Sequence, residues 1–165
     1  MISQLFKKEK TLDFERTYDA PIGAVWQAWT DPEAVRQWWG PEKTSVPECE
    51  IDARVGGRIH IVTEATEEMG KYAGTRWPMS GTFTIVEEGA RLSWDAKSWT
   101  EGEEETTTIV HANDVTLSEE DGTTTVRMHV VISEIGPGAK MAAFGMKWGY
   151  KAYFEKLDHF QSEAP

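Results

Sequence analysis

Cysteine is almost absent from this chain, and so are the patterns that hold metal ions. The 165 residues include one cysteine, Cys49, so no internal disulfide can form and nothing requires an oxidising compartment. None of the four histidines stands in an H-x-x-x-H or H-E-x-x-H pattern, and one cysteine cannot form a zinc knuckle. We therefore expect no metal and no cofactor, and we expect Cys49 to be a buried, inert thiol.

Positive charge is scarce, and long apolar runs are missing. The 28 Asp and Glu residues outnumber 17 Lys and Arg residues, which gives a formal net charge of −11 and disfavours nucleic acids and anionic membranes as partners. No apolar run approaches the ~20 residues of a membrane-spanning helix, and residues 1–8 lack the apolar core of a signal peptide. We expect a cytoplasmic protein that binds neither nucleic acid nor membrane.

Motifs of the common catalytic and nucleotide-binding classes are also missing. The chain has no G-x-S-x-G elbow, no Walker loop and no G-x-G-x-x-G turn. Its length fits one domain, residues 1–165 with a core at about 11–161, and its 39% of apolar residues suffice for one buried core.

Tryptophan, by contrast, is abundant, and half of it lies in one stretch. Residues 19–41 hold four of the eight tryptophans and predict two consecutive short helices, each begun by a proline, Pro21 and Pro32. Asp31 can cap the second helix, and Gly40 can end it in a left-handed conformation. Because helices this short are not stable alone, we expect the pair to pack against a large apolar surface.

Alternation of apolar and polar residues predicts a run of strands joined by short turns. The predicted strands are Leu12–Tyr18, Thr44–Ala53, Arg58–Thr63, Gly81–Val86, Arg91–Ala96, a segment within Thr107–Ser118, and Thr124–Ile132. Residues 66–76 are expected to form a polar connection. The acidic segments 101–105 and 118–121 are expected to be solvated loops.

A long helix is predicted at the end of the chain, from about Ala139 to Gln161. Apolar residues there recur at steps of three and four, and the stripe that we expect to face the sheet contains Met141, Phe144 and Trp148. Strands in an unbroken run imply an antiparallel sheet, so the sequence predicts an α+β fold in which this helix covers one face of about seven strands.

Four motifs in this order resemble those of one family. They are Ala20-Pro21-x-x-x-Val25-Trp26-x-Ala28-Trp29-Thr30-Asp31-Pro32, Trp38-Trp39-Gly40-Pro41, Gly56-Gly57-Arg58-Ile59, and Gly149-Tyr150 followed by Leu157, where Tyr150 stands in place of the usual Trp. The chain is similar over about 11–161 to the family named for the activator of the heat-shock-protein-90 ATPase. That family belongs to the START, polyketide-cyclase and birch-pollen-allergen superfamily.

The resemblance implies the helix-grip fold, in which a curved antiparallel sheet wraps around a long C-terminal helix and two short helices separate the first two strands. It also implies a cavity between sheet and helix, suited to a hydrophobic or aromatic small molecule. The motifs have structural reasons, so the resemblance supplies no catalytic residue. The predicted ligand-binding residues are Trp39, Ile59, Ile61, Phe83, Trp94, His111, Met128, Phe144 and Trp148; alternatively, these residues simply fill the core.

His111 is the polar residue of most interest, because it shares the phase of Ile109 and Val115. A histidine in the cavity could orient a ligand or act as a general base, whereas the alternative is a histidine in a loop. Of Trp38 and Trp39, one is expected to be structural and the other to reach the cavity.

Three functions therefore stay open at this stage. The first is a module that binds a small hydrophobic molecule. The second is a cyclase, dehydratase or hydrolase that uses the same cavity, with His111, Asp95 or Glu134 as candidate groups. The third, implied by the family name, is a chaperone-associated protein contact. A protein partner and a homodimer are also left open.

Overall fold

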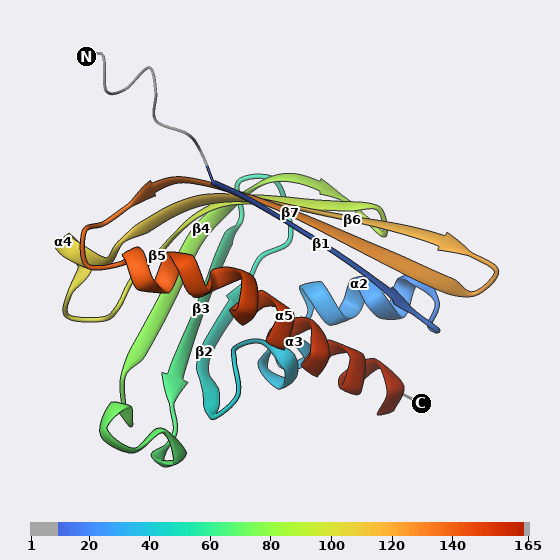
Figure 1. Ribbon diagram of the computed structural model, residues 1–165. Coiled ribbons are helices and arrows are strands. Elements are labelled where there is room, and N and C mark those ends of the chain that lie inside the picture. Colours follow the sequence, from blue (N-terminus) through green and yellow to red (C-terminus); the bar gives the residue numbers. More distant parts are fainter. Residues whose placement is uncertain (1–9, 164–165) are drawn as a thin grey trace, which may run out of the picture.

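One antiparallel sheet organises the chain, and its strands follow the order β1-β7-β6-β5-β4-β3-β2. The computed structural model describes residues 10–163, so the segment 1–8 discussed above lies outside the described residues. The strands are β1 (Lys10–Tyr18), β2 (Thr44–Ile51), β3 (Arg58–Ala65), β4 (Arg76–Glu87), β5 (Arg91–Ser98), β6 (Ile109–Glu120) and β7 (Thr123–Ile135). The sheet is strongly curved, and its two halves enclose the long helix (Figure 1).

The short helix pair and the long C-terminal helix lie on the concave side of this sheet, whereas the two other helical segments lie in loops at its ends (Figure 1). The elements are α2 (Ile22–Thr30), α3 (Pro32–Trp38), the 3₁₀ segment η1 (Glu67–Tyr72), α4 (Glu104–Thr107) and α5 (Lys140–Glu163). Helices α2 and α3 lie between β1 and β2 in the chain, and α5 runs through the hollow of the sheet (Figure 1). The predicted α+β helix-grip fold is thereby confirmed. Among the helices of residues 10–163, none combines the length and apolar character that crossing a bilayer requires.

The helix pair begins and ends where its sequence predicts. The side chain of Asp31 accepts a hydrogen bond of 3.0 Å from the backbone N–H of Glu33, which caps α3. Gly40 adopts a left-handed φ of 92° just after the helix. Trp38 is 1% exposed and donates its indole N–H to the Ala28 carbonyl oxygen at 2.8 Å, so it is the structural member of the tryptophan pair.

Strand β4 is longer than the predicted strand, which covered only residues 81–86. It begins at Arg76, inside the stretch expected to be a polar connection, and the remainder of that stretch holds η1. Pro78 hides this half of the strand from a pattern-based prediction because proline is rare in central strands. Gly81 is required here, since a Cβ at this position would overlap the backbone carbonyl oxygen of Asp95 in β5.

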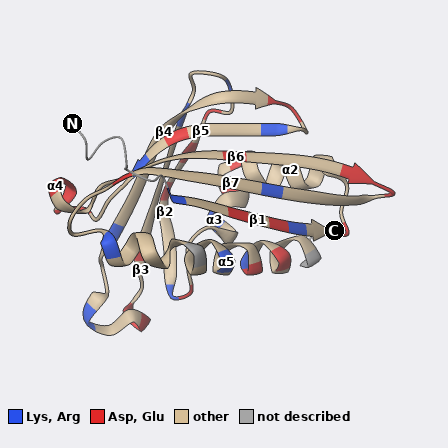
Figure 2. Ribbon diagram, turned by 45° about the horizontal axis from the view of Figure 1, so that its top comes forward, with Lys and Arg blue, Asp and Glu red and all other residues tan. Residues whose placement is uncertain are grey.

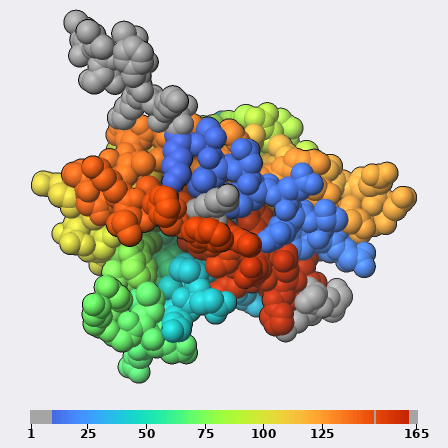
Figure 3. Space-filling model, in the orientation of Figure 1, coloured from blue at the N-terminus to red at the C-terminus, as the bar shows by residue number. Residues whose placement is uncertain are grey.

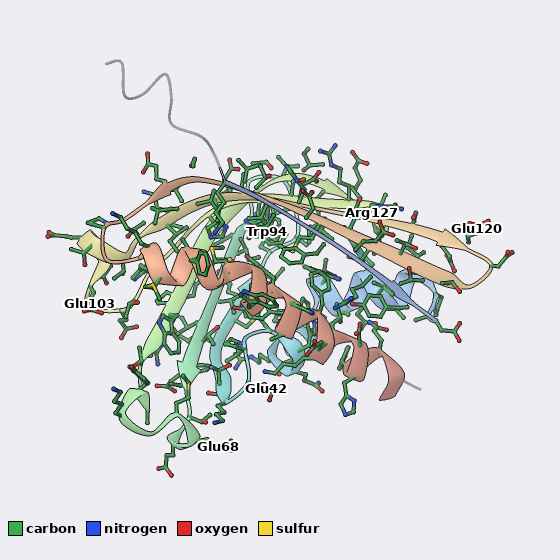
Figure 4. The ribbon with its side chains drawn as sticks, in the orientation of Figure 1. Glu42, Glu68, Trp94, Glu103, Glu120 and Arg127 are labelled. Carbon is green, nitrogen blue, oxygen red and sulfur yellow. The ribbon has the colours of Figure 1, made fainter. Side chains whose placement is uncertain are left out.

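The acidic segments lie at the tips of the molecule, as expected of solvated chain. Residues 118–121 are exposed at the end of the β6–β7 hairpin, and Figure 2 shows acidic residues, in red, at this end and in α4. Glu103 and Glu120 point outward from these tips, whereas Trp94 lies in the interior (Figure 4). Part of the expected loop is helical, because α4 occupies Glu104–Thr107 and Thr107 donates its hydroxyl to the Glu103 carbonyl oxygen at 2.8 Å.

Helix α5 packs on a different face from the one expected. Ala143, Tyr150, Phe154 and Leu157 are buried, whereas Met141, Phe144 and Trp148 are 83%, 71% and 63% exposed. The expectation about these three residues was wrong because α5 carries apolar residues on more than one side, and spacing alone does not say which side meets the sheet.

Candidate ligand-binding pocket

A pocket of about 370 Å³ lies between the first half of α5 and the curved sheet. We call it the α5 pocket. In Figure 3 the orange first half of α5 borders the green surface of β4 and η1. The residues that line it are Trp39, Pro41, Thr44, Thr63, Met69, Trp77, Pro78, Met79, Ser98, Trp99, Thr100, Thr107, Ile109, Gly138, Ala139, Ala142, Gly145, Met146, Gly149, Tyr150 and Tyr153.

Small residues on one side of α5 leave room for this pocket. Ala142, Gly145 and Gly149 recur at steps of three and four, so they share one side of the helix and line the pocket. A Cβ added at Gly145 or Gly149 would meet nothing within 4 Å. Glycine in a helix interior costs roughly 1 kcal/mol relative to alanine, and here no close neighbour demands it.

Aromatic and sulfur-containing side chains contribute eight of the eighteen other lining residues. Trp39 lines the pocket just after α3, Trp77 lines it from β4, and Trp99 lines it just after β5. Tyr150 and Tyr153 line it from α5. Burial raises the pKa of Tyr153 to about 12 and raises that of Tyr150 further. Both phenols therefore stay protonated near neutral pH and can donate a hydrogen bond.

One polar side chain in the wall belongs to a buried hydrogen-bonded chain. Ser98 Oγ lies 2.9 Å from Nε2 of His111, and Nδ1 of His111 lies 3.2 Å from Oδ1 of Asn113. His111 and Asn113 are each 2% exposed. Burial lowers the pKa of His111, against a smaller opposite effect of its hydrogen bond to Asn113, so the imidazole is neutral at pH 7.

The predicted site residues fall into three places. Trp39 lines the α5 pocket, and it is the member of the tryptophan pair that reaches it. Trp39, Ile59, Ile61 and Trp94 surround a separate void of only about 10 Å³, which is too small for any ligand. Trp94 also packs edge to face against Phe83, with ring centroids 6.2 Å apart.

The other predicted residues lie outside the wall of the α5 pocket. His111 does not line the pocket, but it contacts Ser98, which does. Met128 is buried in the core, and Phe144 and Trp148 face solvent, where the ammonium groups of Lys10 and Lys151 lie over their rings at 5.6 Å. Contact of these residues with a ligand stays a prediction that this geometry does not favour.

Several pocket residues escaped the sequence-based prediction. Trp77 lay between the expected polar connection, residues 66–76, and the strand predicted at 81–86, and Trp99 and Ser98 lay beyond the predicted end of the fifth strand. The available signal was the presence of tryptophan itself. Trp77 and Trp99 stand next to polar segments, and a large aromatic side chain there indicates partial burial.

Titratable groups elsewhere form surface pairs. On the outer face of β1, β5, β6 and β7, His129 Nδ1 lies 2.6 Å from Asp13 Oδ1, and Arg91 donates to Asp114 at 2.9 Å. Cys49 is half-buried, and desolvation raises the pKa of its thiol to about 11. No cluster of three or more His, Cys, Asp or Glu side chains with metal-binding geometry occurs within residues 10–163.

Comparison with solved structures shows the same fold in bacterial proteins. A putative uncharacterized protein from Rhizobium leguminosarum is 23% identical with a TM-score of 0.73, and the match covers 95% of this chain and 97% of that chain. A Mycobacterium smegmatis protein is 20% identical with a TM-score of 0.73, over 96% and 98% of the two chains. One from Nitrosomonas europaea is 24% identical with a TM-score of 0.69, over 93% and 94%. Identities this low show the fold alone.

The sequence comparison is more specific. A search among curated proteins gave no match. A family model described as Activator of Hsp90 ATPase homolog 1-like protein matches residues 19–161, which is most of the chain and includes the helix pair, the sheet from β2 onward and α5. The chain therefore belongs to the Activator of Hsp90 ATPase homolog 1-like family.

Proposed function

We propose that this protein binds an uncharged, mainly apolar small molecule in the α5 pocket. The observation that carries the proposal is the chemistry of the wall. None of the lining residues in the described part of the chain is Asp, Glu, Lys, Arg or His, although 27% of the chain is charged.

The wall selects against charge for a simple physical reason. An ionised ligand would lose its hydration shell on entry and would find no opposite charge among the described lining residues. An apolar ligand has no such hydration energy to lose, and it gains contact with indole, phenol and thioether groups. The volume of about 370 Å³ lies within the range of small-molecule sites, roughly 300–1,000 Å³.

Enzymatic use of the pocket receives less support. Asp95 and Glu134 are exposed and do not line it, so neither acid is placed for chemistry there. His111 reaches the pocket only through Ser98. A chaperone-associated contact rests on the family description alone.

The proposal is tested by titrating the full chain with an uncharged dye, Nile red, and with an anionic dye, 8-anilinonaphthalene-1-sulfonate. High salt screens the repulsion between the anionic dye and the acidic protein. We expect saturable binding of one Nile red per chain with a blue-shifted emission, and binding of the anionic dye at least tenfold weaker.

A control is needed because α5 also exposes apolar side chains to solvent. The double variant Phe144→Ala and Trp148→Ala removes the two exposed aromatic rings, which lie outside the pocket wall. Nile red affinity should be unchanged in this variant. Loss of binding there, or equal affinity for both dyes, would contradict the proposal.

A further inference from the structure

Two polar residues occupy inward positions of β6 that would otherwise be apolar. His111 and Asn113 follow Ile109 and precede Val115 and Leu117 on the buried face of the strand, and all five are under 8% exposed. Burying a polar side chain is unfavourable unless its hydrogen bonds are made. Burial of His111 and Asn113 is therefore expected to lower the stability of the fold unless their hydrogen bonds compensate. Those hydrogen bonds indicate the role of the two residues.

Those hydrogen bonds lead to the pocket. The Asn113 amide nitrogen donates to the Trp94 carbonyl oxygen at 3.4 Å, and its side-chain amide lies against Nδ1 of His111 at 3.0–3.2 Å. This contact fixes the plane of the imidazole. Its other nitrogen, Nε2, is thereby directed at Ser98 Oγ, 2.9 Å away, and Ser98 is part of the pocket wall.

A hydroxyl held in this way keeps hydrogen-bonding capacity for a second partner. A serine hydroxyl has one donor and two acceptor positions, and the neutral imidazole occupies one of them. If Nε2 accepts from Ser98, the serine oxygen can still accept a hydrogen bond. If Nε2 donates, the serine hydrogen remains to be donated. A ligand alcohol satisfies either arrangement, and a ligand carbonyl satisfies the second.

We propose that the Ser98 hydroxyl, oriented by His111 and Asn113, binds an uncharged oxygen of the ligand, so that the α5 pocket selects apolar alcohols or ketones over hydrocarbons of the same shape. This inference rests on the proposed function. Ser98 contacts the ligand, and His111 and Asn113 are positioning residues.

The test uses three uncharged naphthalenes of nearly equal shape: ethylnaphthalene, acetylnaphthalene and naphthylethanol. Binding to the full chain is followed by quenching of tryptophan fluorescence, since three tryptophans line the pocket. In the wild-type chain we expect at least one oxygenated compound to bind roughly three- to tenfold more tightly than the hydrocarbon. Preference for both oxygenated compounds identifies Ser98 as the donor, and preference for the alcohol alone identifies it as the acceptor.

The matched variants are Ser98→Ala and Thr63→Val. Both remove one hydroxyl from a residue of the pocket wall, but among the described residues Thr63 takes no part in the hydrogen bonds of Ser98, His111 and Asn113. Ser98→Ala should abolish the preference for oxygenated compounds and leave hydrocarbon affinity within about twofold. Thr63→Val should keep the preference.

The positioning role has its own test. His111→Gln retains an amide that can bond Ser98, whereas His111→Leu does not, and thermal melts show whether each variant is folded. We expect the glutamine variant to retain the preference for oxygen and the leucine variant to lose it. If His111 only fills space, both variants behave alike.

The failures of the two proposals are distinguishable. Equal binding of all three naphthalenes, or an unchanged preference in Ser98→Ala, overturns the inference about Ser98 but leaves the pocket as a binding site. Absence of saturable binding by all three compounds overturns both.

Discussion

The indole of Trp39 packs against the phenol ring of Tyr153, with the ring centroids 5.0 Å apart. Trp39 immediately follows α3, and Tyr153 lies on α5, so the contact joins the short helix pair to the long helix at the edge of the α5 pocket. Trp39 also borders the small void beside Trp94. Trp39 therefore lines both the pocket and the small void in the core.

Truncation of Trp39 should destabilise the fold strongly. Trp39→Ala removes a ring that is 6% exposed and opens the void into the pocket, so we expect a loss of about 3–5 kcal/mol in the free energy of unfolding. Trp39→Phe retains an aromatic partner for Tyr153 and should lose less. Urea denaturation measures both, and a loss below about 1 kcal/mol in the alanine variant would show that Trp39 does not support this boundary.

The packing face of α5 can be tested with one pair of phenylalanines. Phe154 is 2% exposed and lies 5.7 Å from the ring of Phe14 in β1, whereas Phe144 is 71% exposed. We expect Phe154→Ala to cost about 3–5 kcal/mol and Phe144→Ala to change stability by no more than about 0.5 kcal/mol. Equal losses, measured by urea denaturation, would place the helix in a different rotation.

His111 should make the stability of the protein sensitive to mild acid. Because its folded-state pKa is lowered, the unfolded chain binds a proton near pH 6.5 while the folded protein does not. Stability is therefore complete above the unfolded pKa and falls as the pH drops toward the folded pKa, by at most about 1.4 kcal/mol per pH unit.

The comparison that isolates this effect is between the wild-type chain and His111→Gln from pH 7 to pH 5. The variant should lose less stability over this interval, since other titrating groups contribute equally to both proteins. Identical slopes in the two proteins would mean that His111 is protonated in the folded state as readily as in the unfolded chain.

The architecture could be predicted from the sequence because its signals are local. Pro32, Asp31 and Gly40 define one helix by backbone chemistry alone, and alternation in β6 and β7 defines their inward faces. The family motifs follow from the same local requirements. The fold class could therefore be predicted from apolar periodicity, and the family from its motifs.

The site could not be predicted to the same degree, for two physical reasons. The rotation of α5 about its axis is set by which side chains fit the curved sheet, and Gly145 and Gly149, which help to form the pocket, carry no hydrophobic signal. Ser98 is a candidate ligand-binding residue because its hydroxyl is held by Nε2 of His111, and His111 belongs to the neighbouring strand. Neither relationship exists in the sequence until the chain is folded.

The most direct measurement of the central claim compares two substitutions at Gly149. A Cβ fits there without a close neighbour, so Gly149→Ala should raise the free energy of unfolding by about 1 kcal/mol and retain Nile red binding. Gly149→Phe should fold with similar stability, because its ring can enter the pocket, and should weaken Nile red binding at least tenfold. Undiminished binding by a folded Gly149→Phe protein would contradict the account, since the dye would then be binding somewhere other than the α5 pocket.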